Sequence, residues 1–289
     1  MKVSQRQLYA DRIERVVRHL EARAPEEGVP SVAELAAVAA MSEFHFHRVF
    51  RLMTGETVGE TVRRLRLART LPELESEATV ARAAGASGYA TSQAYARALK
   101  AQAGTSARTA RADPANLDSL AAALRTPQRT SAEAAPAIAV EVVSVEPFRL
   151  LAMRNVGDYA ELNAAYGRLF DLVLAQVAPE RLDGIYGVPH DDPRFTPAAQ
   201  CRFECALAVD EGTAEGELAE LSLGGGDHVR LRHLGDYDRL PETIDRAYAA
   251  AITLFDRELG DAAPYVHYLD DPDEVPEPLL RADVYVPLR

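Results

Sequence analysis

Residues 41–55 read MSEFHFHRVFRLMTG, and this stretch decides the fold class of the first half of the chain. Ser42 is a residue type that begins helices, and Gly55 is one that ends them. Apolar residues between them recur at the spacing of one helix face, at Phe46, Val49 and Phe50. The segment therefore predicts a short helix with an apolar core side. Its outer side then carries Phe44, His45, His47, Arg48 and Arg51.

A second predicted helix precedes this one and is joined to it by a tight turn. Ser31 begins it, and Glu34 completes a capping box of the Ser-x-x-Glu type. Ala39 and Ala40 are small enough to let two helices approach closely at the turn. The sequence therefore predicts a helix-turn-helix unit that ends at Gly55.

The same pattern recurs after an arginine-rich helical stretch at residues 57–74. A short helix around Ala83 and a turn at Gly88 precede a helix that Thr91 caps and Gly104 ends. Arginine and glutamine at the exposed start of such a helix suit hydrogen bonding to guanine and adenine in the major groove. A helical bundle with solvated arginines is the alternative, and two units in tandem favour a DNA-binding domain. The candidate contacts on the later helix are Ser92, Gln93, Arg97 and Lys100.

The segment SVAELAAVAAMSEFHFHRVFRLMTGETVGETVRRLRLARTL resembles the DNA-binding domain of AraC-type transcription regulators. The resemblance covers about residues 5–111 and implies seven helices, two of which read successive major-groove segments. It implies base contacts from Phe44, His47 and Arg48 in the first recognition helix, and from Ser92, Gln93 and Arg97 in the second. The second unit departs from the family pattern at Ala83, Gly85 and Leu99.

Charge is divided unevenly along the chain, whose net charge is −12. Residues 1–129 hold 19 basic and 14 acidic residues, a balance of +5, and residues 130–289 hold 13 and 30, a balance of −17. A basic first half is compatible with nucleic acid as a partner, whereas an acidic surface is typical of a protein kept soluble by its charge.

Several protein classes are excluded by simple features. No apolar run approaches the roughly 20 residues that span a bilayer, and the N-terminus lacks the apolar core of a signal peptide. On a strand, Cys201 and Cys205 would lie about 13 Å apart, too far for a disulfide. His45 and His47 point to different sides of a helix and cannot share a metal. We therefore expect a protein of the bacterial cytoplasm with no membrane segment, metal, cofactor or catalytic residue.

Composition changes after the helical region. Residues 127–136 (PQRTSAEAAP) are small, polar and bounded by proline, which is typical of a linker. We expect a DNA-binding domain at residues 1–112, a linker at 113–137 and a second domain at 138–289.

An internal repeat organises this second domain. RNVGDY at residues 154–159 matches RHLGDY at 232–237, and the tripeptide Asp-Asp-Pro recurs at 191–193 and 270–272. Each copy reads strand, helix, strand, strand, which predicts two α+β units paired around a pseudo-two-fold axis with a cleft between them. Three glycines at 224–226 lead into a strand and predict a hairpin turn.

The stretches IAVEVVSVEPFRLLAMRNVGDY, RFECALAVD, GGGDHVRLRHLGDY and RADVYVPL are similar to the GyrI-like effector-binding domain over about residues 138–289. The resemblance implies a cleft that binds hydrophobic, often cationic drugs, and aromatic faces suit such ligands. Val266 stands where the family usually has a glutamate in an E-x-Y motif, which favours a neutral or differently placed ligand. The candidate lining residues are Tyr159, Tyr186, Phe203, Tyr237, Tyr265, Tyr268 and Tyr285, with Glu204 and Asp283 as charged partners.

The sequence thus predicts a multidomain protein, with an all-α tandem helix-turn-helix domain followed by an α+β domain of two repeats with a central cleft. The predicted function is a transcription regulator that binds double-stranded promoter DNA and a small, largely apolar, drug- or stress-like effector. RNA polymerase is a candidate further partner. One alternative is a GyrI-like hydrolase or sequestering protein for a reactive toxin. Another is a module that binds gyrase or polymerase as a protein partner.

Overall fold

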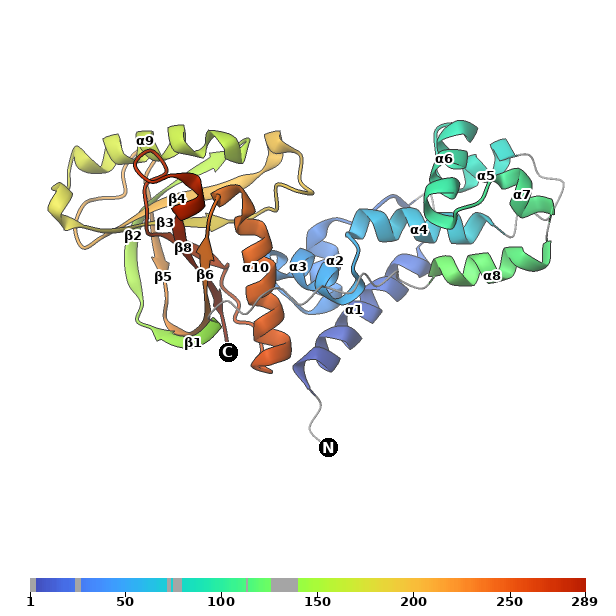
Figure 1. The fold of residues 1–289 in the computed structure, drawn as a ribbon, viewed down its shortest axis with the longest axis horizontal. Coiled ribbons are helices and arrows are strands. Elements are labelled where there is room, and N and C mark those ends of the chain that lie inside the picture. The colour runs from blue at the N-terminus through green and yellow to red at the C-terminus, as the bar shows by residue number, and fades with distance from the viewer. Residues whose placement is uncertain (1–3, 24–26, 72–73, 75–79, 113, 126–139) are drawn as a thin grey trace. The chain divides into compact units, whose positions relative to one another are not determined.

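The computed structural model describes residues 4–23, 27–71, 74, 80–112, 114–125 and 140–289 (Figure 1). The chain divides into two compact units. Residues 9–133 form one, here called the helical unit, and residues 134–289 together with residues 1–8 form the other, called the sheet unit. Among the described residues, no helix is both long and apolar enough to cross a membrane.

The described residues from Gln5 to Arg125 form helices joined by short turns. Between residues 5 and 112 these residues form α1–α7, the seven helices that the AraC-type resemblance implies, and α8 follows. The bounds are α1 (Gln5–Ala22), α2 (Val32–Ala39), α3 (Glu43–Thr54), α4 (Val58–Thr70), α5 (Val80–Ala86), α6 (Ser92–Ala103), α7 (Ala107–Ala112) and α8 (Pro114–Arg125).

Local side-chain chemistry sets several of these helix ends. Ser31 and Glu34 form the predicted capping box at α2, and Gly55 ends α3 with a left-handed backbone at φ 76°. Ser42 occupies the predicted N-cap of α3, but its side chain makes no capping hydrogen bond. Thr57 forms a second capping box at α4, which the sequence reading did not single out.

Helix α8 lies where the sequence predicted a linker. Its buried residues Leu117, Ala121 and Leu124 join the apolar core that Leu67, Leu71, Tyr95 and Leu99 also form. The predicted linker is therefore wrong for residues 114–125, because the apolar spacing within that segment buries one side of a helix. The rest of the predicted linker, residue 113 and residues 126–137, lies outside the described residues.

The sheet unit contains one antiparallel sheet in the strand order β1-β6-β8-β7-β3-β4-β2-β5. The repeat prediction is confirmed, since β2-α9-β3-β4 is followed by β6-α10-β7-β8, and the two halves meet where β3 pairs with β7. The bounds are β1 (Val140–Val145), β2 (Phe148–Val156), α9 (Leu162–Leu174), β3 (Leu182–Pro189), β4 (Arg202–Val209), β5 (Ala219–Leu223), β6 (Gly226–Leu234), α10 (Leu240–Ala249), β7 (Tyr265–Tyr268) and β8 (Arg281–Pro287).

The outermost strands are exchanged between the two repeats. β1 precedes the first repeat but pairs with β6 of the second, and β5 precedes the second repeat but pairs with β2 of the first. The glycines at 224–226 therefore link two strands that do not pair with each other, and the predicted hairpin turn is wrong. A Cβ at Gly224 would collide with the carbonyl oxygen of Glu146, so the two short links pass in close contact.

Both helices of the sheet unit cover the same face of the sheet. α9 packs on Leu151, Met153, Phe203, Cys205 and Leu207. α10 contacts β6 and β8, where Thr243 bonds to His233. Because side chains alternate along paired strands, these residues all lie on one face, called the helix face. The other is called the open face.

Candidate functional site

Helix α3 carries the first set of residues predicted to contact DNA. His47 is exposed, and Phe44 and Arg51 are partly buried. His45 and Arg48 are buried, with exposed fractions of 3% and 7%, so their predicted place on an exposed outer side is wrong.

Helix geometry explains the burial of His45 but not that of Arg48. His45 lies four residues before the buried Val49 and so on the flank of the core stripe. Arg48 points about 160° away from Phe46, so the core side of α3 does not account for its burial. Contact of His45 and Arg48 with DNA stays a prediction.

Helix α6 carries the second predicted set. Gln93, Arg97 and Lys100 are exposed, Ser92 is partly buried, and Tyr95 and Leu99 fill the core behind them. Thr91 caps the helix, since its Oγ1 accepts the amide of Ala94 at 3.1 Å. Exposed arginine and lysine can bind phosphates, and glutamine and arginine can reach base edges. Base contact by these residues stays a prediction.

Two tyrosines of the sheet unit form equivalent hydrogen bonds in the two repeats, at the starts of β4 and β8. The hydroxyl of Tyr159 donates to the carbonyls of Asp191 and Arg202 at 3.0 and 2.8 Å. That of Tyr237 donates to the carbonyls of Asp270 and Arg281 at 2.9 and 2.8 Å. Burial raises the pKa of Tyr237 to about 12, so its phenol stays protonated as a donor. The duplicated Gly-Asp-Tyr motif therefore ties each helix start to the repeat's Asp-Asp-Pro turn.

The centre of the helix face is apolar and aromatic. The ring of Tyr268 lies edge-on to Tyr166 of α9 and to Tyr237, at centroid distances of 5.9 and 4.9 Å. Tyr159 packs edge-on against Phe203 at 5.1 Å. Val266, 1% exposed, occupies the place of the family's glutamate on this face. An apolar side chain there offers no charge to a cationic ligand.

The open face carries a second aromatic group. Tyr265 and Tyr285 stack at 4.8 Å, and Tyr186 stacks on His267 at 4.4 Å. Sequence reasoning missed three members of this group, although strand alternation with Tyr186, Tyr265 and Tyr285 could have found them. They are Phe148, His228 and His267.

The nine candidate ligand residues therefore do not line one cleft. Tyr159, Phe203, Tyr237 and Tyr268 lie on the helix-face side, whereas Tyr186, Tyr265, Tyr285, Glu204 and Asp283 lie on the open face. The physical reason is that adjacent strand residues point to opposite faces of a sheet. Which of the nine bind a ligand stays a prediction.

Both acidic candidates already have cationic partners. Arg154 donates to Glu204 at 2.6 Å, and Arg232 donates to Asp283 at 2.5 Å, in equivalent places of the two repeats. His190 beside Glu204, together with Arg154, holds the pKa of that carboxyl at about 2. These carboxylates are neutralised by arginine, so they are poor counter-ions for a ligand cation.

A hollow of about 390 Å³ lies at the end of the sheet where β2 and β3 begin and β4 ends. It is lined by Phe148, Arg149, Glu180, Arg181, Leu182, Asp183, Ala208, Val209 and Asp210. Apart from Phe148, it shares no lining residue with the two aromatic groups. Across the described residues, no three histidine, cysteine, aspartate or glutamate side chains gather as metal ligands.

Family models of known proteins match both halves of the chain. A model of the GyrI-like small molecule binding domain matches residues 138–289, and a helix-turn-helix domain of the AraC type matches residues 35–113. Probable transcriptional regulator YgiV of Escherichia coli strain K12 is 29% identical over 119 residues, which are 39% of this chain and 71% of that protein.

Two solved structures are also similar. A chain of the EcmrR–DNA complex, with a TM-score of 0.42, is 16% identical; the match covers 53% of this chain but only 57% of that one. A hydrolase from Listeria innocua, with a TM-score of 0.39, is 15% identical over 54% of this chain and 94% of its own. Since the GyrI-like match spans more than half of its length, the chain belongs to the family of proteins with a GyrI-like small molecule binding domain, joined here to an AraC-type helix-turn-helix domain.

Proposed function

We propose that the chain is a ligand-responsive transcription regulator. The helical unit binds promoter DNA, and the sheet unit binds a small effector. The observation that carries this proposal is the presence, in one chain, of a tandem helix-turn-helix domain and a GyrI-like domain. The exposed Gln93, Arg97 and Lys100 on α6 supply the groups that such contact needs.

The proposed effector is small, largely apolar and uncharged. Val266 removes the acid from the helix face, and the carboxylates of Glu204 and Asp283 are held by arginines. A cation placed against these aromatic groups would lose hydration without gaining Glu204 or Asp283 as a free counter-ion. Effector binding changes DNA occupancy only to the extent that it favours one state of the protein over another.

RNA polymerase is the further partner in this proposal, and the bacterial cytoplasm is where a promoter-binding protein acts. A regulator changes transcription either through its own DNA affinity or through a contact with polymerase. In vitro transcription from a bound promoter, with and without the protein, separates these two routes, because only the second raises initiation at saturating promoter occupancy.

A GyrI-like hydrolase is the alternative function, and it has less support in the site. Hydrolysis needs an acid or base positioned at the reacting atoms. Val266 supplies neither on the helix face. Incubation with electrophilic toxins tests this alternative, and turnover that follows protein concentration would favour it.

The DNA test is a selection of genomic fragments by the full chain, followed by fluorescence anisotropy across a salt series. We expect sequence-selective binding with a steep salt slope. Arg97→Ala should cost about 1–3 kcal/mol and relax the selected sequence. The same loss in Arg48→Ala counts as a base contact only if the variant melts at the wild-type temperature, because Arg48 is buried. Arg108→Ala, an exposed arginine on α7, is the matched control for charge alone. Equal binding of selected and scrambled DNA by the wild-type chain would contradict the proposal.

The effector test compares two probes of similar size on the full chain. The neutral fluorophore phenylnaphthylamine should bind, whereas tetraphenylphosphonium should bind more weakly, because the carboxylates of Glu204 and Asp283 are already paired with arginines. Tighter binding of the cation would contradict the proposed neutral effector while leaving the DNA-binding role intact.

A further inference from the structure

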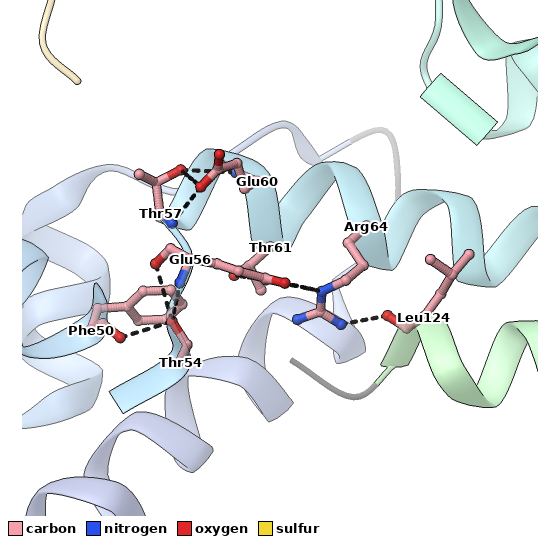
Figure 2. A network of polar contacts seen from close by, with 8 residues as sticks. All are labelled: Phe50, Thr54, Glu56, Thr57, Glu60, Thr61, Arg64 and Leu124. Carbon is pink, nitrogen blue, oxygen red and sulfur yellow. Dashed lines mark hydrogen bonds and ion pairs between the residues drawn. The ribbon is translucent and has the colours of Figure 1, made fainter. Parts of the chain in front are cut away.

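A fully buried arginine sits in the middle of the helix that joins the two helix-turn-helix units. The side chain of Arg64 on α4 has no exposed surface (Figure 2). Its Nε donates to both carboxylate oxygens of Glu56, at 3.0 and 2.9 Å. Its Nη1 donates to the backbone carbonyl of Leu124, in the last turn of α8. One guanidinium group thus connects the turn before α4 with the end of α8.

The same network reaches the end of the first recognition helix. The amide of Glu56 donates to Oγ1 of Thr54 at 3.1 Å, and that hydroxyl donates to the carbonyl of Phe50 at 2.8 Å. Thr61 on α4 donates to the Glu56 carboxylate at 3.1 Å. Figure 2 shows these side chains in one line from α3, across α4, to Leu124.

Helix α8, which receives this connection, belongs to the core of the second helix-turn-helix unit. Leu117, Ala121 and Leu124 are buried there with Tyr95 and Leu99 of α6. Phe46, Val49 and Phe50 of α3 are buried residues of the first unit. Arg64 therefore forms a polar joint that connects the elements carrying the two recognition helices.

The chemistry of this joint is poorly suited to stabilisation alone. Moving an arginine and a glutamate out of water carries a desolvation cost that their attraction often only offsets. Nη2 of Arg64 is also buried, with no hydrogen-bond partner among the described residues. Apolar side chains of similar size would pack there at less cost, but they would not fix direction as a planar guanidinium does.

We propose that the Glu56–Arg64–Leu124 connection is a positioning device that fixes the orientation of α6 relative to α3. It thereby sets the spacing at which the two recognition helices reach DNA. This effect on DNA binding rests on the proposed function. Arg64 is a positioning residue in this scheme and does not itself contact DNA.

The first test measures orientation without DNA. Spin labels are placed on the full chain at Glu43→Cys on α3 and Ala101→Cys on α6, both exposed, and the interlabel distance distribution is recorded. Cys201 and Cys205 are buried, and a sample without the introduced cysteines reports any labelling of them. We expect Arg64→Met to broaden or shift the distribution. Arg63→Met, an exposed neighbour on α4, should leave it unchanged.

A second variant distinguishes a change in helix orientation from a loss of folding. In the double variant Glu56→Leu/Arg64→Met no buried charge is left unpaired, so its melting temperature should equal or exceed that of the wild type. Its distance distribution should still be broad. If folded Arg64→Met and the double variant both keep the wild-type distribution, α4 alone sets the geometry and the proposal is wrong.

The DNA readout separates this inference from the proposed function. One base pair is inserted between the two contacted segments of a selected site. This should weaken wild-type binding about tenfold or more, and the penalty should shrink towards none in Arg64→Met. If the wild-type chain selects no sequence, the proposed function fails, whereas the distance measurement still decides the positioning role.

Discussion

Tyr265 and Tyr285 lie directly opposite each other on β7 and β8, and their rings stack at 4.8 Å with 9° between the ring planes. The hydroxyl of Tyr265 is buried and has no hydrogen-bond partner among the described residues. Burial holds the pKa of Tyr265 well above its ordinary value, so the phenol is a neutral donor. The aromatic group of the open face thus contains a buried phenol donor whose hydrogen bond is not made within the described residues.

Tyr265→Phe tests whether the Tyr265 hydroxyl lacks a hydrogen bond in the ligand-free protein. Removing an unsatisfied buried hydroxyl while keeping the ring should raise the free energy of unfolding by about 1 kcal/mol. Urea denaturation of the sheet unit within the full chain measures the change. A loss of 1 kcal/mol or more would mean that the hydroxyl is hydrogen-bonded in solution. Tyr186→Phe is the matched control from the equivalent strand of the other repeat.

Glu204 should make stability depend on pH at the acid end. Hydrogen bonding to His190 and Arg154 holds its folded-state pKa at about 2, below its ordinary value of 4.5. The folded state therefore binds the proton less readily than the unfolded state, so the stabilisation is present above pH 4.5. It is lost as the pH falls towards about 2.

The measurement is the difference in unfolding free energy between the wild type and Glu204→Gln as a function of pH. The difference should be largest, up to about 3 kcal/mol, near neutrality and should shrink below pH 4.5. Taking the difference removes the contributions of other carboxylates. A pH-independent difference would show that the pairs with His190 and Arg154 do not form in solution.

Gly187 on β3 should tolerate no larger residue. A Cβ there would lie 2.8 Å from Cε1 of Phe203 and 2.9 Å from the hydroxyl oxygen of Tyr166. Gly187→Ala should therefore destabilise the sheet unit by about 1–3 kcal/mol, as overpacking does. Gly167→Ala on α9 is the control, because a Cβ there meets nothing within 4 Å and should stabilise the helix by about 0.5–1 kcal/mol. Thermal unfolding that ranks these two variants the other way round would rule out this packing.

Two N-cap residues of the helical unit should differ in importance although the sequence makes them look alike. Oγ1 of Thr57 accepts the amide of Glu60 at 3.2 Å, and the Glu60 carboxylate accepts the amide of Thr57 at 2.8 Å. Thr57→Ala should cost about 1 kcal/mol. Ser42→Ala should cost little or nothing, since its buried hydroxyl has no hydrogen-bond partner in the described part of the chain. The helical circular dichroism signal during urea denaturation gives both values, and equal costs would contradict the assignment.

The elements that the sequence predicted well are those with a local signal. The Ser31 capping box, the glycine stops and the apolar spacing of α3 and α6 depend on neighbours within a few residues. The duplicated Gly-Asp-Tyr motif likewise predicted two repeats, since each copy makes the same bonds through Tyr159 and Tyr237.

The features that the sequence did not predict depend on distant partners. The apolar spacing of α8 is a local signal, but the core that it joins, with Leu67 and Leu71 of the α4 region and Tyr95 and Leu99 of α6, is set by tertiary packing. The division of the aromatic residues between two faces depends on the register of β3, β4, β7 and β8, which composition does not disclose. The pairing of Glu204 and Asp283 with arginines follows from the register of β2 with β4 and of β6 with β8.

The exchange of β1 and β5 has a consequence for how this unit can be divided. A fragment that ends with β4 would leave β1 without β6, and the outer edge of β2 would be bare without β5. Neither half would be a complete folding unit, so the smallest autonomous piece is the whole span from β1 to β8. Two halves supplied as separate polypeptides, cut between β4 and β5, would each present exposed edges that only the other can cover. Such a protein should reconstitute from its halves as an obligate heterodimer, with each fragment contributing one outer strand to the other's edge.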